Sequence, residues 1–357
     1  MEKLNVAIIG QGRSGRDIHG AFLKSENNTL FNVKAVVEID PERRALALEE
    51  YPGCEVFESY TELYGRDDID MVVNATMSMD HFAITKDLLS NRFNVITEKP
   101  FARNRYECDT LIKIANENNV KLGAFHQSLF APFFVGTKKI IEEGKLGDIK
   151  QIDITYNGFN RRWDWQTAQV MLAGSVYNTG PHPIGYALSL LDWDPDFKVV
   201  FSKLDTVLTS GDAEDYAKII ITAPGKPVVD IEISSNDAYP TGSIIKLLGS
   251  KGTYKCATGS YDMKYIVDGE NPEQKLILEP MKKENGLPAY CSEKLITHEE
   301  SGEYKGSAFD IGTKCFYEMM YNAITKGEEM AVKPEYAAMV ISVIEQVHAE
   351  NPLPVKF

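Results

Sequence analysis

A glycine-rich loop near the start of the chain has the residue types and spacing of a phosphate-binding turn. Residues Asn5–Ile9 form a short apolar run that predicts a buried strand, and Gly10-Gln11-Gly12-Arg13-Ser14-Gly15 follows it directly. Gly10 allows a tight turn, Gly12 lets a pyrophosphate approach the backbone, and Gly15 lets the next helix pack on the strand. The free N–H groups and the dipole of that helix attract an anion. The loop therefore predicts a dinucleotide site built from Gly10, Gly12, Arg13, Ser14 and Gly15.

A carboxylate follows at the distance expected for a ribose ligand. Glu38 ends the apolar run Val33–Val37 and lies about twenty residues past the loop. A carboxylate there accepts hydrogen bonds from both ribose hydroxyls and repels a 2′-phosphate, which favours NAD over NADP. Arg43 and Arg44 follow closely and soften that preference, so NADP stays open. The plainer alternative is an ordinary strand–helix turn with a capping acid, and the combination of strand, loop, helix and acid favours the dinucleotide site.

Polar residues also stand at the ends of two further predicted strands. Ile69–Thr76 ends at Thr76, and Phe93–Thr97 runs into Glu98-Lys99-Pro100. Because ligands of parallel sheets bind at the carboxyl ends of strands, Thr76, Glu98 and Lys99 are expected at the cofactor. The positive nicotinamide ring would lower the pKa of Lys99 and suit it to proton transfer. From spacing alone, a surface turn in which Glu98 and Lys99 face water is an equal alternative.

A histidine stands at the mouth of a later predicted helix. The stretch Gly174–Gly180 leads through Pro181 to His182, and the helix is expected to run on to Leu191. Histidine is the natural proton shuttle near neutral pH. Asn178 lies four residues earlier, so a helix here would place both side chains on one face. A lone histidine on a helix is more often structural, but glycine, asparagine and proline neighbours are typical of a site.

The spacing of apolar residues divides the chain into two domains. Residues 1–124 alternate strands and helices, which is typical of a doubly wound parallel sheet of the Rossmann type. Residues 125–357 contain alternating apolar and polar segments that predict a large, open, mostly antiparallel sheet, so this domain is of the α+β class. Its predicted strands are Ile149–Tyr156, Lys198–Leu208, Asp215–Thr222, Val228–Ser234 and Ser243–Leu248. Its predicted helices include Pro132–Glu143 and two late ones, Ala308–Lys326 and Pro334–Glu350, that are free to pack back on the first domain.

Composition excludes several classes of partner. The chain of 357 residues has 38 Lys and Arg against 52 Asp and Glu, a net charge of −14, and no basic block, so neither nucleic acid nor a membrane surface is expected to bind. Five scattered cysteines without metal-ligand spacing indicate reduced thiols and no metal site. No apolar run is long enough to span a membrane, and the first predicted strand leaves no room for a signal peptide. We therefore expect a cytoplasmic protein.

Four features together resemble the Gfo/Idh/MocA family of sugar and polyol oxidoreductases. They are the glycine loop with Glu38, the Glu98-Lys99-Pro100 triplet, the Gly144-x-x-Gly147-x-Ile149 turn, and the Gly174…Gly180-x-His182 stretch. The resemblance implies an NAD-dependent dehydrogenase acting on a secondary alcohol of a sugar, sugar derivative or cyclic polyol. It also implies that Lys99 bridges the nicotinamide ribose and the reacting hydroxyl, and that His182 is the general base. The loop with Trp163 and Trp165 is then expected to help form the substrate pocket.

The chain departs from the family pattern at two places. Asn178 stands where members often have Asp, and an amide orients a histidine without raising its pKa. His182 is then a weaker base, or Lys99 carries more of the proton transfer. Where many members carry an Arg after the strand ending at Phe125, this chain has His126 and Gln127, which we take as candidate substrate residues.

Two other functions stay open on the sequence. The same fold supports transient oxidation, so an NAD-retaining glycosidase or epimerase is one alternative. A non-catalytic, nucleotide-sensing regulator is the other, and the presence of Lys99 and His182 disfavours it. The broad apolar face of the second sheet suggests a homodimer or homotetramer.

Overall fold

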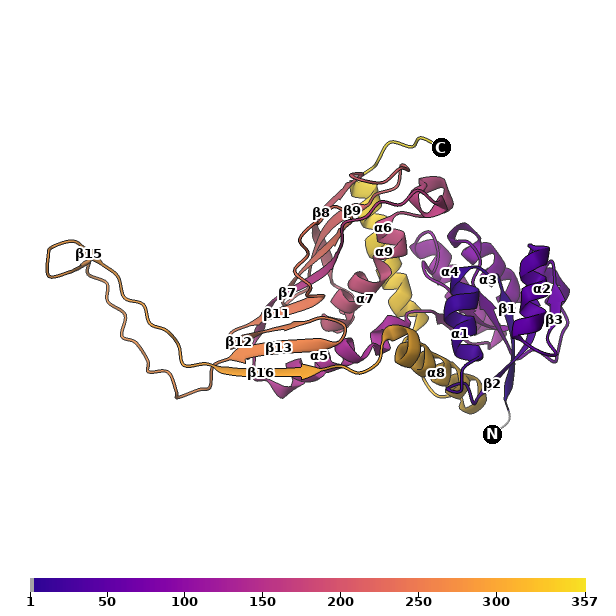
Figure 1. Cartoon of the computed structure of the whole chain (residues 1–357), viewed down its shortest axis with the longest axis horizontal. Coiled ribbons are helices and arrows are strands. Elements are labelled where there is room, and N and C mark those ends of the chain that lie inside the picture. Colours follow the sequence, from indigo (N-terminus) through magenta and orange to yellow (C-terminus); the bar gives the residue numbers. More distant parts are fainter. Residues whose placement is uncertain (1–2) are drawn as a thin grey trace.

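The structure, a computed structural model, describes residues 3–357, and its N-terminal part is a six-stranded parallel sheet (Figure 1). The strands are β1 (Leu4–Ile9), β2 (Phe31–Val37), β3 (Glu55–Phe57), β4 (Met71–Asn74), β5 (Asn94–Thr97) and β6 (Leu122–Ala124). Their order is β3-β2-β1-β4-β5-β6, so the chain winds outward from β1 in both directions. This confirms the predicted doubly wound sheet, whose strand order reverses between β1 and β4 and leaves a crevice at their carboxyl ends.

Helices cover both faces of this sheet, because successive side chains of a strand point to opposite sides. Ala7 and Ile9 belong to one buried cluster with residues of α3 (His81–Ser90) and α4 (Arg105–Asn118). Val6 and Ile8 belong to another with residues of α1 (Gly20–Leu23), α2 (Pro41–Glu50) and α8 (Thr313–Lys326). A helix from the end of the chain therefore completes the core of the first domain.

The second sheet has eight strands (Figure 1). In spatial order they are β16 (His298–Glu303), β13 (Ser260–Tyr265), β12 (Gly252–Cys256), β11 (Ile245–Gly249), β7 (Ile149–Asn157), β10 (Val228–Ser234), β9 (Tyr216–Thr222) and β8 (Lys198–Asp205). Only β7 and β10 pair in parallel, so the predicted mostly antiparallel sheet is confirmed. β12, β13 and β16 were not predicted. β16 reads HEESGE, an almost wholly polar segment that is a strand because it pairs with β13 and not because of its own pattern.

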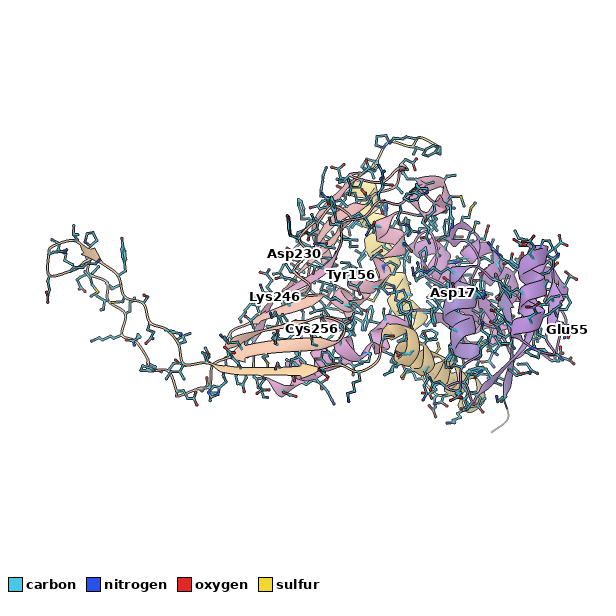
Figure 2. The ribbon with its side chains drawn as sticks, viewed as in Figure 1. Asp17, Glu55, Tyr156, Asp230, Lys246 and Cys256 are labelled. Carbon is cyan, nitrogen blue, oxygen red and sulfur yellow. The ribbon has the colours of Figure 1, made fainter. Side chains whose placement is uncertain are left out.

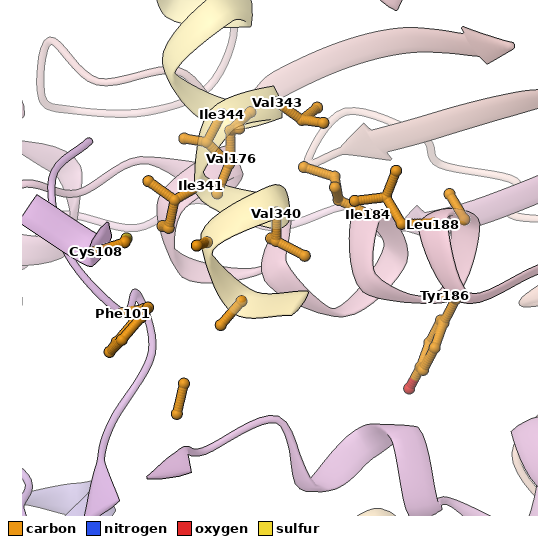
Figure 3. Close-up of a cluster of buried hydrophobic side chains, with 14 of the residues drawn as sticks. Phe101, Cys108, Val176, Ile184, Tyr186, Leu188, Val340, Ile341, Val343 and Ile344 are labelled. Atoms are coloured by element: carbon orange, nitrogen blue, oxygen red, sulfur yellow. The ribbon is translucent and has the colours of Figure 1, made fainter. Parts of the chain in front are cut away.

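Three helices cover the apolar face of the second sheet. They are α5 (Pro132–Glu143), α7 (Pro181–Leu190) and α9 (Pro334–Glu350). Figure 3 shows Ile341 of α9 facing Cys108 of α4, with Val340 turned toward Ile184 of α7. Helix α9 thus packs against helices of both domains. The domain boundary between residues 124 and 125 remains a prediction.

The other face of the second sheet is charged. Lys218 Nζ lies 2.7 Å from Asp230 Oδ1 and 3.1 Å from Glu232 Oε2. Figure 2 shows Asp230 and Lys246 on the side of the sheet away from the helices. The apolar face that suggested an oligomer is therefore covered by the chain's own helices, and the expected homodimer or homotetramer stays a prediction.

The helices are short. The longest, α9, has 17 residues, and α4 and α8 have 14 each. A helix needs about 20 apolar residues to cross a bilayer. Across residues 3–357, no helix combines the length and apolar character that a membrane crossing requires.

Candidate active site

The glycine loop has space for a side chain at Gly12 but none at Gly10 or Gly15. Gly10 has φ +91°, and a Cβ there would lie 2.6 Å from the carbonyl oxygen of Ala75. A Cβ on Gly15 would lie 1.8 Å from the carbonyl oxygen of Gly10, so these two glycines allow the close packing of the loop. A Cβ on Gly12 would meet nothing within 4 Å. The open side of Gly12 is the space that a pyrophosphate needs beside the backbone.

Glu38 closes this loop from the end of β2. Its carboxylate is buried and accepts hydrogen bonds from the backbone N–H of Gln11 (2.7 Å) and of Asp40 (3.0 Å). Arg43 Nη1 lies 3.8 Å from the same carboxylate, whereas Arg44 donates to the backbone carbonyls of Glu38 and Ile39. Of the two arginines, only Arg43 therefore has its guanidinium group beside the carboxylate of Glu38.

The turn after β4 is held by hydrogen bonds among its own residues. The strand predicted to end at Thr76 ends at Asn74, and Thr76 lies in the turn directly after it, where its Oγ1 donates to Asn74 Oδ1 at 2.7 Å. His81 is buried, with Nδ1 2.7 Å from the carbonyl oxygen of Pro100. This contact connects the turn after β4 to the turn after β5.

Glu98 and Lys99 do not form a surface turn. Glu98 is 3% exposed, and its Oε2 accepts the backbone N–H of Lys99 at 2.9 Å. The Lys99–Pro100 peptide bond is cis. Lys99 Nζ donates to the backbone oxygen of Asn178 at 2.8 Å and to its Oδ1 at 3.1 Å. Lys99 of the first domain thus reaches Asn178 of the second across the crevice.

Burial lowers the pKa of Lys99. Loss of solvent is the largest cause, and the positive charges of Arg13 and Arg162 add to it, while Glu98 opposes the shift. The sequence predicted a lowered pKa from the cofactor ring alone. In the structure, the protein itself already produces the shift.

Glu98 contacts His19, which in turn contacts Tyr317, and neither residue was predicted from the sequence. His19 Nε2 lies 3.2 Å from Glu98 Oε1, and His19 Nδ1 lies 2.8 Å from the hydroxyl of Tyr317. Burial opposes ionisation of Glu98, but the contact with His19 prevails and lowers its pKa to about 2. His19 sits on a π-helical turn, η1 (Gly15–His19), directly after the glycine loop, and that position is its one sequence signal. Tyr317 comes from α8, and no signal in the sequence predicts its contact with His19.

His182 contacts the segment after β6 instead of Asn178. Its Nδ1 lies 2.8 Å from Ser128 Oγ, in the short helix η4 (Gln127–Phe130). Burial, then the charge of Lys99, lowers the pKa of His182 to about 3, and the same causes lower that of His126 to about 4. Both histidines are therefore neutral at neutral pH, and His126, Gln127 and Ser128 are all buried.

The helix expected to carry both Asn178 and His182 is divided in two. Asn178 ends α6 (Ser175–Asn178), and His182 lies in the first turn of α7. Pro181 and Pro183 have no N–H to continue an α-helical ladder from α6, and Gly180 packs against the backbone of Val176. The side chain of Asn178 therefore contacts Lys99, whereas that of His182 contacts Ser128.

A cavity of about 640 Å³ opens beside Asn178 and the glycine loop. Its charged and amide side chains come from both domains and include Arg13, Asn157, Asn160, Arg162, Gln166 and Asn178. Trp163 is 78% exposed, and neither it nor Trp165 is among the residues that line the cavity, so their part in substrate binding stays a prediction. Their loop contributes the polar neighbours Arg162 and Gln166 to the lining.

The acids that line the cavity are already bound to backbone N–H groups. Glu214 accepts the N–H of Val176 at 2.8 Å. Asp215 accepts the N–H groups of residues 207–209 at 2.6 to 2.8 Å. The other polar groups of the lining are amides, hydroxyls and guanidinium ions, a composition that suits a molecule rich in hydroxyl groups.

We expect Gly12→Ala and Gly15→Ala to separate cofactor binding from folding. Gly15→Ala forces a backbone clash and should cost about 1–3 kcal/mol of stability, visible as a lower Tm. Gly12→Ala should leave Tm unchanged but raise the Kd for NAD by about tenfold or more, a loss of about 1.4 kcal/mol. Thermal scans and calorimetric titration of both variants check this. Full NAD affinity in Gly12→Ala would contradict the open-position interpretation.

We also expect stability to fall as the pH drops from about 6.5 toward 4. The unfolded chain takes up protons at His126 and His182 near pH 6.5, while the folded protein does so only near their lowered pKa values. Each histidine then contributes a loss of up to about 1.4 kcal/mol per pH unit in this window. Urea unfolding of wild type, His126→Asn and His182→Asn at several pH values measures it. Equal slopes in all three proteins would refute it.

The chain matches two models of one oxidoreductase family. The model described as the NAD-binding Rossmann fold matches residues 4–126, and the model described as the C-terminal alpha/beta domain matches residues 138–350. These matches confirm the predicted fold class and NAD as the cofactor of the first domain.

Relatives and solved structures agree over almost the whole chain. An uncharacterized oxidoreductase of Schizosaccharomyces pombe is 25% identical over 374 residues, covering 98% of this chain and 97% of that protein. The scyllo-inositol 2-dehydrogenase (NADP(+)) IolW of Bacillus subtilis is 24% identical over 351 residues, covering 97% and 93%. KijD10, a 3-ketoreductase from Actinomadura kijaniata solved with NADP, shares the fold with a TM-score of 0.77 at 17% identity, covering 98% of both chains. The chain therefore belongs to the Gfo/Idh/MocA family of NAD-binding oxidoreductases.

Proposed function

We propose that the protein is an NAD-dependent dehydrogenase for a secondary alcohol of a sugar, sugar derivative or cyclic polyol. The observation that carries the proposal is Lys99, whose Nζ meets Asn178 at the edge of a cavity lined by amides, hydroxyls and guanidinium ions. The names of two similar proteins, an inositol dehydrogenase and a 3-ketoreductase, support a small substrate rich in hydroxyl groups.

The residues of the first domain fit a dinucleotide. Gly12, Arg13 and Ser14 would hold its pyrophosphate, and Glu38 would accept hydrogen bonds from the adenosine ribose. Thr76, Glu98 and Lys99 would stand at the nicotinamide end, where the bound cofactor supplies the acceptor for hydride. Glu38 favours NAD, and Arg43 beside it leaves NADP as an alternative cofactor.

Asn178 orients the amine of Lys99 so that it can act as the base. An uncharged amine has two N–H bonds and one lone pair, and the two oxygens of Asn178 accept two N–H bonds from Lys99 Nζ. The lone pair is then free to take the proton of the substrate hydroxyl. The pKa of Lys99 is lowered by burial, which favours this uncharged form. His182, with a pKa of about 3, is a weaker base and orients the hydroxyl as a neutral ring.

Lys99→Ala should lower kcat for alcohol oxidation by about 10²–10⁴-fold while NAD still binds. The measurement is reduced-nicotinamide absorbance with NAD and NADP separately, against cyclic polyols, aldoses, amino sugars and glycosides. Lys113→Ala, at an exposed position of α4, is the matched control and should behave as wild type. His182→Asn should lose less than Lys99→Ala.

Three outcomes would overturn this function. Unchanged turnover in Lys99→Ala would remove Lys99 from the reaction. Conversion of a glycoside or epimer without net cofactor reduction would instead indicate the NAD-retaining chemistry. Tight NAD binding together with a stable protein complex and no turnover on any compound would indicate a regulator.

Asn178→Asp should shift the acid limb of the kcat/KM profile for oxidation to higher pH by about one unit or more. A carboxylate beside Nζ stabilises the ammonium form and raises the pKa of Lys99, so the free base appears only at higher pH. Asn178→Ala removes the same oxygen without adding charge and should not shift the limb upward. A profile of Asn178→Asp that overlays the wild type would argue against Lys99 as the base.

A further inference from the structure

The short helix α6, which ends at Asn178, is held at its first turn by a buried glutamate. Glu214 is 2% exposed, and its Oε1 accepts the backbone N–H of Val176 at 2.8 Å. The backbone oxygen of Glu214 accepts the N–H of Ser175, also at 2.8 Å. Gly174 packs directly on the carboxylate, because a Cβ there would overlap Oε1. One glutamate therefore fixes the residues with which α6 begins.

The same carboxylate contacts a histidine from the last helix of the chain. His348 of α9 has Nε2 3.3 Å from Glu214 Oε2, and its Nδ1 lies 2.8 Å from the backbone oxygen of Ile344. A carboxylate oxygen and a carbonyl oxygen only accept hydrogen bonds, so both ring nitrogens donate and the ring is an imidazolium ion. Burial opposes this charge, but the contact with Glu214 prevails and raises the pKa of His348.

The ring of His348 also contacts α6 directly. It stacks on the ring of Tyr177, with centroids 4.8 Å apart and planes inclined by 28°. Figure 1 accordingly shows α6 beside α9. The hydroxyl of Tyr177 donates to the backbone oxygen of Arg103, just before α4, at 2.9 Å. The residues of α6 that precede Asn178 are thus each held by a contact outside the helix.

We infer that Glu214 and His348 are positioning residues, which hold α6 so that Asn178 faces the proposed base. The inference rests on the proposed function, in which Lys99 is that base. Helix α6 has only four residues, too few for a helix to be stable by itself, so its place is set by these contacts. The two oxygens of Asn178 meet Lys99 Nζ at 2.8 and 3.1 Å. A misplacement of about 1 Å in such a geometry can cost about 10²-fold in rate.

The place of the pair in the fold favours this role over a purely structural one. Glu214 lines the same cavity as Asn178. His348 is not among the residues that line the cavity, so it acts on the site through Glu214 and Tyr177. A structural pair would lower Tm when broken but leave kcat unchanged, so the two roles can be separated by experiment.

The first test compares two variants that each remove the imidazole from a His–Glu pair. His348→Phe keeps an aromatic ring but removes the donor to Glu214, and it should lower kcat for alcohol oxidation by about 10–10²-fold with an unchanged Kd for NAD. His298→Phe is the matched control and should keep the wild-type kcat. His298 Nε2 lies 2.6 Å from Glu270 Oε2 at the base of the projecting segment 267–297 (Figure 1). An unchanged kcat in folded His348→Phe would overturn the inference.

A double-mutant cycle then tests whether His348 acts through Asn178. In an Asn178→Ala background the amide is already absent, so adding His348→Phe should lower kcat by no more than about twofold further. The same fold-loss in both backgrounds would show an effect that bypasses Asn178, and would refute the positioning role.

Hydrogen exchange measures the same contacts without a substrate, so its result does not depend on the proposed function. The amide of Val176 should exchange at least about threefold faster in His348→Phe than in wild type or His298→Phe. Glu214→Gln keeps an acceptor for this amide but removes the charge that faces His348, and should also speed the exchange. It is the variant to measure where His348→Phe does not fold. Wild-type exchange in the folded variants would overturn the inference, whereas turnover that survives in Lys99→Ala would reject the proposed function alone.

Discussion

The buried carboxylate of Glu98 is the constraint on which the rest of the site depends. A charge that is almost fully removed from water must be compensated by close partners, because its desolvation costs several kcal/mol. Those partners are His19, directly after the glycine loop, and the N–H of Lys99, while Tyr317 of α8 holds His19 from behind. One ionised group thus fixes the helix that follows the glycine loop relative to the turn that carries Lys99. Helix α8, near the end of the chain, is needed for this arrangement because it supplies Tyr317.

The last two helices of the chain also join the two domains. Helix α8 fills one face of the first sheet, and α9 packs between α4 and the helices of the second sheet. The crevice at the carboxyl ends of β1 and β4 therefore has a fixed opposite wall, which carries Asn178 and His182. Lys99 reaches across this crevice to the backbone and side chain of Asn178, so the site exists only where the two domains meet.

In the proposed reaction, Lys99 acts beside a neutral partner, the amide of Asn178. An amide at position 178 satisfies the hydrogen bonds of an amine without stabilising its protonated form, and burial acts in the same direction. The acids nearby are either paired, as Glu98 is, or bound to backbone N–H groups, as Glu214 and Asp215 are. No free carboxylate among these acids therefore stands beside Lys99.

Features that depend on residues close together in the chain could be predicted from the residue order alone. The glycine loop with Glu38, the strand–helix rhythm and the placement of Lys99 at a strand end follow from residue spacing and from the topology of parallel sheets. The folded structure was needed to find the pairs His19–Tyr317, Lys99–Asn178 and His182–Ser128, the exposure of Trp163, and the projecting segment 267–297. These contacts join residues separated by tens to hundreds of positions, and packing of whole helices and strands, not local propensity, brings them together.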